Sequence, residues 1–254
     1  LEPCAHTGRT GPCAARIVAA GVARVVVGIL DPDARVAGRG VARLRDAGIR
    51  VDVGCGADEV TDDLAPYLHQ RVTGRPYVVL KRAATLDGRT AAPDGTSRWI
   101  TSEAARRDAQ RLRADSDAVL VGAGTVRADD PRLTVRLPGA ERQPLRVVLG
   151  EAPRGARVHP CLEYRGELGA VLDDLGARGV LQLLVEGGAR VAHDFLAQGL
   201  VDRCVAYLAP ALLGGDDGAP VLRGAGAPTM AAMGRGRFVS VARVGEDLRV
   251  EVEP

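Results

Sequence analysis

The first residues of the chain that could do chemistry are two cysteines, Cys4 and Cys13, in the opening segment LEPCAHTGRTGPC. Cysteine thiolates bind zinc, and Cys13 stands where a helical pattern begins, a position that favours the thiolate form. A catalytic zinc ion keeps three protein ligands and one open position, and this segment supplies two of them. Two cysteines would not hold such an ion. We therefore expect either a third ligand upstream of Leu1 or a domain without catalytic activity.

Two other groups have useful chemistry. His159 and Cys161 could act as substitute metal ligands, although a surface histidine beside a loop cysteine is the simpler interpretation. Lys81 is the only lysine among 34 basic residues, the rest being arginine. Arginine cannot release a proton near neutral pH, whereas the pKa of lysine responds to burial and to neighbouring charges. Lys81 is therefore a candidate for proton transfer, with chance codon usage as the alternative explanation.

The segment LLVEGGARVAH has the order strand, glutamate, two glycines, helix. Glycines at such a turn let backbone N–H groups approach an anion at the helix N-terminus, so the segment is a candidate phosphate cradle. A purely structural turn is the alternative. The dinucleotide fingerprint GxGxxG and the phosphate-loop pattern do not occur in the sequence, so neither standard nucleotide-binding fold is indicated.

These groups need elements to position them, and apolar runs alternate with helical patterns along the chain. Near-continuous Val, Leu and Ile runs are typical of strands covered on both faces. Strands are expected at 22–30, 77–85, 118–124, 145–150, 180–188 and 204–214, with a hairpin at 239–254. Helices are expected at 12–21, 40–48, 101–115, with Thr101 or Ser102 as N-cap, and 189–199. The alternation predicts α/β architecture.

Composition limits the class of protein. The 254 residues are 46% hydrophobic and 26% charged with a net charge of +2, values typical of an ordinary soluble protein without a dedicated nucleic-acid or membrane surface. Five scattered cysteines do not form a disulfide framework, so reduced thiols and a cytoplasmic location are expected. The polar segment 57–78, interrupted by Pro66, predicts a boundary near residue 72, giving domains 1–72 and 73–254. The first block is short for an α/β domain.

The long form LEPCxHxGRTxPC resembles the pyrimidine deaminase domain of the bifunctional riboflavin-biosynthesis deaminase/reductases. This resemblance implies a partial cytidine-deaminase-like zinc domain, with Cys4 and Cys13 as metal ligands. It also implies that four residues face the aminopyrimidine: His6, Gly8, Arg9 and Thr10. The sequence departs from the family pattern at Gly11, usually proline, and in having no His-x-Glu motif.

Residues from about Arg75 to Val205 resemble the reductase domain of the same family, which has a dihydrofolate-reductase-like fold. Four ordered motifs carry the resemblance: LKxAxTLDGR, SxWITSxxARxDxxxLR, VGxGTVxADDPxLTVR and LVEGGxxVAxxFL. The implied activity is NADPH-dependent reduction of a phosphorylated ribosylaminopyrimidine to its ribitylamino form, at C1′ of the opened sugar. A homodimer formed through this domain is expected by the same analogy.

The resemblance also implies roles for individual residues. Lys81 would be the general acid near the C1′ oxygen or nitrogen, with Asp129 orienting Lys81 or the nicotinamide ribose and Glu186 as a third catalytic group. The cofactor positions are Ala83, Trp99, Thr125, Asp129, Gly188, Ala189, Arg190, Val191, Ala192, His193 and Asp194. The substrate positions are Ser97, Arg113, Leu133, Arg136 and Glu186, the two arginines serving as forks for the 5′-phosphate.

Some alternatives stay open at this point. Residues 1–72 could be a non-catalytic remnant attached to a reductase. A nucleic-acid-editing deaminase would need a basic, aromatic-rich groove, which 3% aromatic residues do not favour. A nucleotide-binding module without catalysis would make Lys81 dispensable. The segment between Gly150 and Gly169 is short where the family fits another strand, so residues could be missing there.

Overall fold

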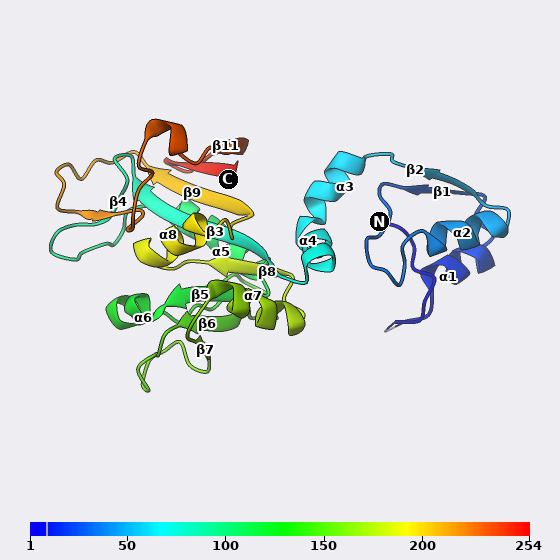
Figure 1. Ribbon diagram of the computed structural model, residues 1–254, viewed down its shortest axis with the longest axis horizontal. Coiled ribbons are helices and arrows are strands. Elements are labelled where there is room, and N and C mark those ends of the chain that lie inside the picture. Colours follow the sequence, from blue (N-terminus) through cyan, green and yellow to red (C-terminus); the bar gives the residue numbers. More distant parts are fainter. Residues whose placement is uncertain (9) are drawn as a thin grey trace. The chain divides into compact units, whose positions relative to one another are not determined.

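The computed structural model describes residues 1–8 and 10–254, and Arg9 lies outside the described residues. The chain forms two compact units, Leu1–Arg75 and Pro76–Pro254 (Figure 1). Both units contain helices and parallel strands, so the expected α/β class is confirmed. None of the described helices is long and apolar enough to cross a membrane.

The first unit is built around two parallel strands, β1 and β2, whose pairing runs from Arg24 opposite Arg50 to Val27 opposite Val53. Helices α1 and α2 pack with these strands around a small apolar core of Ala14, Val27, Val41, Leu44, Ile49 and Val51. The elements of this unit are α1 (Cys13–Ala19), β1 (Arg24–Val27), α2 (Arg39–Asp46), β2 (Arg50–Val53), α3 (Ala57–Asp63) and α4 (Ala65–Thr73).

The opening segment is fixed onto the start of α2 by Glu2. Its buried carboxylate accepts hydrogen bonds from the backbone N–H groups of Gly38 and Gly40, both at 2.9 Å, and of Val41 at 3.1 Å. An acidic group at this end also complements the helix dipole. A Cβ atom at Gly40 would lie 1.7 Å from the carbonyl oxygen of Pro3, so this close approach requires glycine.

The polar segment before the second unit is more ordered than expected. It contains two helices, α3 and α4, instead of an irregular linker. Pro66 does not interrupt a helix, because it occupies the first turn of α4, where a missing backbone N–H costs no intrahelical hydrogen bond. The helix ends at Gly74, which adopts the left-handed conformation with φ +76°.

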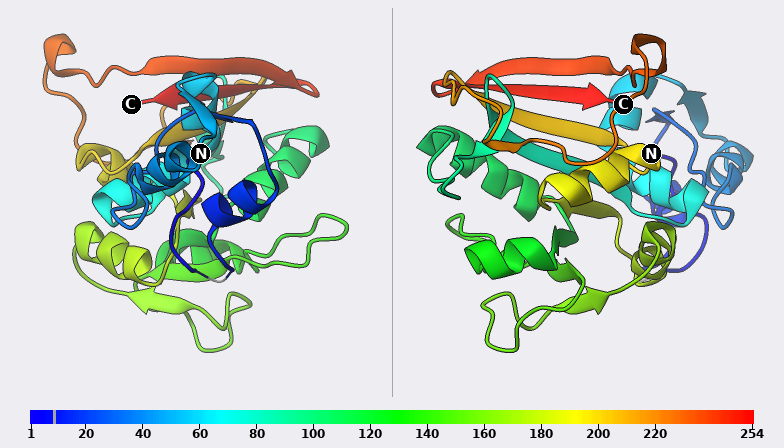
Figure 2. Two further views of the ribbon diagram at one scale, coloured as in Figure 1. Left: turned by 90° about the vertical axis from the view of Figure 1, so that its right-hand side faces the viewer. Right: turned by 60° about the vertical axis from the view of Figure 1, so that its left-hand side comes forward.

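The second unit is organised around an eight-stranded sheet with the order β11-β12-β9-β3-β8-β5-β6-β7. The hairpin β11–β12 forms one edge of the sheet and β7 the other (Figures 1 and 2). The strands of the unit are β3 (Tyr77–Thr85), β4 (Arg89–Ala91), β5 (Ala118–Gly122), β6 (Leu145–Leu149), β7 (Leu162–Tyr164), β8 (Gln182–Val185), β9 (Arg203–Ala209), β10 (Ala219–Pro220), β11 (Arg237–Val244) and β12 (Asp247–Glu253).

Helices cover both faces of the central strands. One face packs against α7 and α8 through residues such as Leu80, Leu183 and Phe195, and the other packs against α5 and α6 through residues such as Val79, Leu184 and Ala109. The helices are α5 (Glu103–Ala114), α6 (Ala123–Asp129), α7 (Leu168–Ala177), α8 (Ala189–Ala197) and the 3₁₀ turn η1 (Met230–Ala232). Two-sided burial explains the continuous apolar runs in the sequence.

Most of the predicted elements of this unit are confirmed, including the C-terminal hairpin and Ser102 as the N-cap of α5, and three strands are shorter than predicted. The run 118–124 is a strand only to Gly122, after which α6 begins, and the run 180–188 is a strand only over Gln182–Val185. The run 204–214 ends as a strand at Ala209, because Pro210 follows and has no N–H to donate. A short strand that was not predicted, β7, pairs with β6 between Gly150 and Gly169.

Candidate active site

Lys81 lies in the middle of β3, on the face of the sheet that α5 covers. Its side chain is half-buried, and this burial lowers the pKa of its ammonium group while the carboxylate of Glu186 opposes that shift. Leu80 is paired with Val185 on the neighbouring parallel strand β8, so Lys81 and Glu186 follow as neighbours on the same face. The lone lysine is therefore held in a water-poor environment beside a carboxylate.

The guanidinium of Arg113, on α5, forms a buried ion pair with Glu186. Arg113 Nη2 donates to Glu186 Oε2 at 2.6 Å and Nε lies 3.1 Å from the same oxygen, while Nη1 donates to the carbonyl of Thr134 at 3.2 Å. Burial raises the pKa of Glu186, but the charges of Arg113 and Lys81 outweigh burial and keep the pKa below its ordinary value. The charge of Arg113 is therefore already paired with Glu186, but Nη1 and Nη2 each keep a second N–H, so its use as a phosphate fork stays a prediction.

A cavity of about 500 Å³ opens above Lys81. Its lining brings together several of the predicted site residues from distant parts of the chain: Lys81, Ser97, Trp99, Arg113, Asp129, Leu133 and Arg136. A smaller cavity of about 160 Å³ has Lys81, Arg113, Arg136, Glu186 and Tyr207 in its lining. The predicted catalytic and substrate residues therefore share one connected region of the second unit.

The cavity of about 500 Å³ also contains three arginines that were not predicted from the sequence: Arg98, Arg132 and Arg157. Arg157 comes from the segment before β7, and its backbone N–H donates to Asp130 Oδ1 at 2.7 Å. The charges of Arg113 and Arg157 contribute to lowering the pKa of Arg136, after burial as the main cause. Nothing in the sequence around Arg157 indicates this role, because only tertiary folding brings that loop to the cavity.

A larger cavity, of about 800 Å³, lies at the N-terminal ends of α6 and α8. Thr125, Asp129 and the run 188–191 line it, so Asp129 belongs to both cavities. Gly188 is the N-cap of α8 and leaves the first N–H groups of this helix without a side-chain cap. Three arginines also line this cavity: Arg127, Arg190 and Arg223. Backbone N–H groups and guanidinium groups together suit a polyanionic ligand.

Only part of the predicted phosphate-binding segment 188–194 lines this cavity in the structure. Residues 188–191 line the cavity, whereas Ala192 is buried in the core. His193 turns toward the loop at Ala225, where its Nε2 lies 2.9 Å from the carbonyl oxygen, and its Nδ1 lies 3.2 Å from Asp194. The rotation of successive side chains around α8 is the reason, because a helix cannot turn seven consecutive residues to one ligand.

Trp99 could have been a core residue, but it is 68% exposed. Its ring lies 4.3 Å from the guanidinium carbon of Arg106 and 5.8 Å from that of Arg98. Ser97, two residues earlier, lines the same cavity. A large, flat side chain held beside cations at the mouth of a cavity is suited to stacking on a planar ligand ring.

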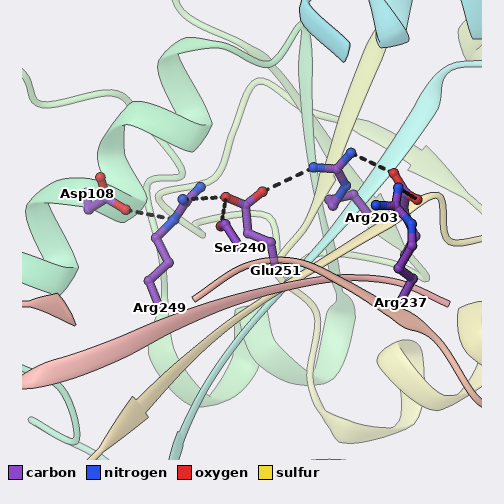
Figure 3. Close-up of polar contacts among 7 residues, drawn as sticks. Asp108, Arg203, Arg237, Ser240, Arg249 and Glu251 are labelled. Carbon is purple, nitrogen blue, oxygen red and sulfur yellow. Dashed lines mark hydrogen bonds and ion pairs between the residues drawn. The ribbon is translucent and has the colours of Figure 1, made fainter. Parts of the chain in front are cut away.

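A polar network lies next to Lys81 on the α5 side of the sheet. The ammonium group of Lys81 lies 5.8 Å from the centroid of the Tyr207 ring, and Tyr207 donates its hydroxyl to Asp108 at 2.7 Å. Asp108 in turn pairs with Arg249 Nε at 3.1 Å. The network continues across the edge strands through Glu251, Ser240 and Arg203 (Figure 3). Ala83 lies beside this network, opposite Tyr207 in the pairing of β3 with β9.

In the first unit the structure brings Cys4 and Cys13 together. The backbone N–H of Cys13 donates to Cys4 Sγ at 3.4 Å. The Nδ1 atom of His6 is buried and has no hydrogen-bond partner in the described part of the chain. Gly8 and Thr10 are joined by a backbone hydrogen bond of 3.0 Å, and Arg9 between them is outside the described residues. Within residues 1–8 and 10–254, no third metal-binding donor gathers with the two thiols.

Comparison with known proteins agrees with this geometry. A family model described as the RibD C-terminal domain matches residues 76–250. Riboflavin biosynthesis protein RibD of Chlamydia muridarum is 46% identical over 88% of this chain and 70% of that protein. The structure superposes on form 1 of Acinetobacter baumannii RibD with a TM-score of 0.93, at 36% identity over 100% of this chain and 79% of that one. A Thermotoga maritima deaminase/reductase gives a TM-score of 0.88 at 30% identity, over 100% of this chain and 77% of that one.

Proposed function

The chain belongs to the RibD family of riboflavin biosynthesis proteins, and from this membership we propose that residues 76–254 reduce 5-amino-6-(5-phosphoribosylamino)uracil to its ribitylamino product with NADPH. The observation that carries the proposal is the junction of the two cavities at Asp129. One cavity suits a polyanionic cofactor, the other contains a buried amine, and reduction requires that cofactor and substrate meet.

The residues of the larger cavity fit a dinucleotide phosphate. The uncapped N-terminus of α8 and the guanidinium groups of Arg127, Arg190 and Arg223 would hold its phosphates. Asp129, at the junction, would accept hydrogen bonds from the nicotinamide ribose, and Trp99 would border the nicotinamide end. When bound, NADPH supplies the hydride. The protein's own contribution is to orient the two molecules and to keep water away from the reacting atoms.

Lys81 would donate the proton. Once the ribose ring is open, C1′ carries an oxygen or nitrogen atom that needs a proton as hydride arrives, and the Lys81 ammonium group lines the cavity where this atom would lie. The lowered pKa of Lys81 makes it a stronger acid than an exposed lysine. Glu186 and Arg113 would hold its position, and Ser97 and Leu133 would contact the substrate.

The proposal is tested by following the oxidation of NADPH in the presence of the aminopyrimidine ribose phosphate. We expect consumption of reduced cofactor that depends on substrate and yields the ribitylamino product by mass spectrometry. A nucleotide-binding module without catalysis would bind NADPH but leave it reduced. Binding without any turnover under these conditions would overturn the proposal.

We expect the 5′-phosphate to lie between Arg136 and Arg157, because Arg113 is occupied by Glu186. Arg157→Gln should raise KM for the phosphorylated substrate about tenfold to a hundredfold, the value of one or two charge-assisted hydrogen bonds, with kcat much less affected. The matched control is Arg165→Gln, an exposed arginine just after β7 that pairs with Glu151. Equal KM values in both variants would show that Arg157 does not contact the phosphate.

We also propose that residues 1–72 belong to a cytidine-deaminase-like zinc domain that deaminates the preceding diaminopyrimidine. The donor chemistry fits two zinc ligands, since the Cys13 thiol contacts Cys4, and His6, two residues after Cys4, has a buried Nδ1 without a hydrogen-bond partner among the described residues. Zinc bound there would activate water. The alternative, a reductase with a non-catalytic first unit, predicts no zinc bound through these thiols. A cytoplasmic homodimer is proposed by analogy alone.

A further inference from the structure

A cluster of potential metal ligands lies outside the proposed site, at the start of β7. There a histidine, a cysteine and a glutamate offer one donor atom each, and the three donors lie within 4.8 Å of one another. We propose that His159, Cys161 and Glu163 form a three-ligand zinc site that fastens the loop before β7, separate from Cys4 and Cys13 of the first unit and independent of the proposed function.

The spacing of the donors fits tetrahedral zinc. Cys161 Sγ lies 3.5 Å from His159 Nδ1. Zinc–sulfur and zinc–nitrogen bonds of about 2.3 and 2.0 Å, meeting at a tetrahedral angle, separate the two ligand atoms by about 3.5 Å. A thiol–imidazole hydrogen bond has a similar length, so a metal titration is needed to distinguish the two. The combination of imidazole, thiolate and carboxylate selects zinc and related transition metals over calcium or magnesium.

The surroundings already orient the donors as zinc ligands require. His159 Nε2 lies 3.0 Å from the carbonyl oxygen of Pro153, which can only accept, so the ring proton sits on Nε2 and Nδ1 presents its lone pair to Cys161. Metal-binding histidines typically donate their other N–H in this way. Glu163 Oε1 accepts from the backbone N–H of Ala152 at 3.2 Å, and Arg146 donates to the carbonyl of His159 at 3.1 Å.

The site has a structural consequence for the neighbouring cavity. Both His159 and Glu163 contact the beginning of the loop, at Pro153 and Ala152, so an ion that fixes these two ligands would also hold the two ends of the segment 152–163 together. Arg157, which lines the active-site cavity, lies within that segment, and its backbone is hydrogen-bonded to Asp130. Three protein ligands leave a fourth position for water, and the half-buried setting of His159 and Cys161 suits a site that is closed on one side.

The first test is cobalt(II) titration of the 254-residue chain carrying Cys4→Ser and Cys13→Ser, which removes the two thiols proposed as zinc ligands in the first unit. We expect a thiolate-to-cobalt charge-transfer absorption that saturates at one ion per chain and is displaced by zinc. Adding Cys161→Ser should abolish the absorption, whereas adding Cys204→Ser, another half-buried cysteine, should leave it unchanged. An absorption that is absent from the start, or that survives Cys161→Ser, would overturn the proposal.

A second measurement reports on the loop without spectroscopy. Trypsin cleaves after arginine, and Arg154 and Arg157 both lie just before the ligands, in the loop whose start is hydrogen-bonded to His159 and Glu163. Zinc should slow cleavage at these two positions at least tenfold in the protein with Cys161 intact and have no effect in the Cys161→Ser variant. Equal cleavage rates with zinc and with chelator in both proteins would contradict a metal-fastened loop, because the loop would then not respond to the ion.

Discussion

Replacing Lys81 with methionine is expected to lower kcat by about 100- to 10,000-fold, the usual contribution of a positioned proton donor. Methionine keeps an unbranched side chain as far as Cε, with sulfur in place of Cδ, and lacks the ammonium group. Lys81→Arg should also lose most turnover, since arginine keeps the charge but does not release its proton near neutral pH. The affinity for NADPH should stay within a few-fold of wild type, because no described contact of Lys81 reaches the larger cavity. Trp99, the only tryptophan, lines the site and reports binding through its fluorescence.

The pH dependence of kcat separates proton donation from a structural role for Lys81. A general acid must be protonated, so wild-type kcat should fall as pH rises through the pKa of Lys81, which burial places below that of an exposed lysine. The methionine variant should lack this alkaline limb. A wild-type rate in either variant, or the same alkaline limb in Lys81→Met, would remove the basis for Lys81 as the acid.

The second large effect is expected from Glu186→Gln, which leaves the buried charges of Arg113 and Lys81 without their carboxylate. Breaking a buried ion pair by removing one partner costs about 3–5 kcal/mol of unfolding free energy, because an uncompensated charge stays in the interior. Urea denaturation measures this. The matched control is Glu151→Gln, which breaks an exposed pair with Arg165 and should cost about 1 kcal/mol or less. Similar losses of unfolding free energy in both variants would mean that the pair of Glu186 with Arg113 stabilises the protein no more than an exposed ion pair does.

The same substitution has a defined dependence on pH. Positive neighbours hold the pKa of Glu186 in the native state below its value in the unfolded chain. The stabilisation is therefore complete above the ordinary glutamate pKa and is lost as pH falls through the native-state value. The stability gap between wild type and Glu186→Gln should narrow in that acidic window. In the variant, the alkaline limb of kcat should also move to lower pH, since Glu186 is the group that raises the pKa of Lys81.

Periodicity and motif order were enough to predict most elements of the second unit. The run 77–85 is β3 to the residue, because two-sided burial gives a continuous apolar signal. Ser102 as N-cap of α5 was one of the two expected alternatives. The end of β5 at Gly122 was missed, because the apolar run continues into α6 and hydropathy does not separate a buried strand from the first turn of a buried helix.

The sequence by itself determined the kinds of residue available at the site: one lysine, a Glu-Gly-Gly turn and a set of arginines in ordered motifs. Only the tertiary structure decided how they are used. The pairing of β3 with β8 sets Lys81 beside Glu186, α5 commits Arg113 to that carboxylate, and the loop before β7 brings Arg157 to the same cavity. Local sequence encodes backbone preference and burial, whereas contacts between residues far apart in the chain depend on strand order and helix packing, which no local pattern specifies.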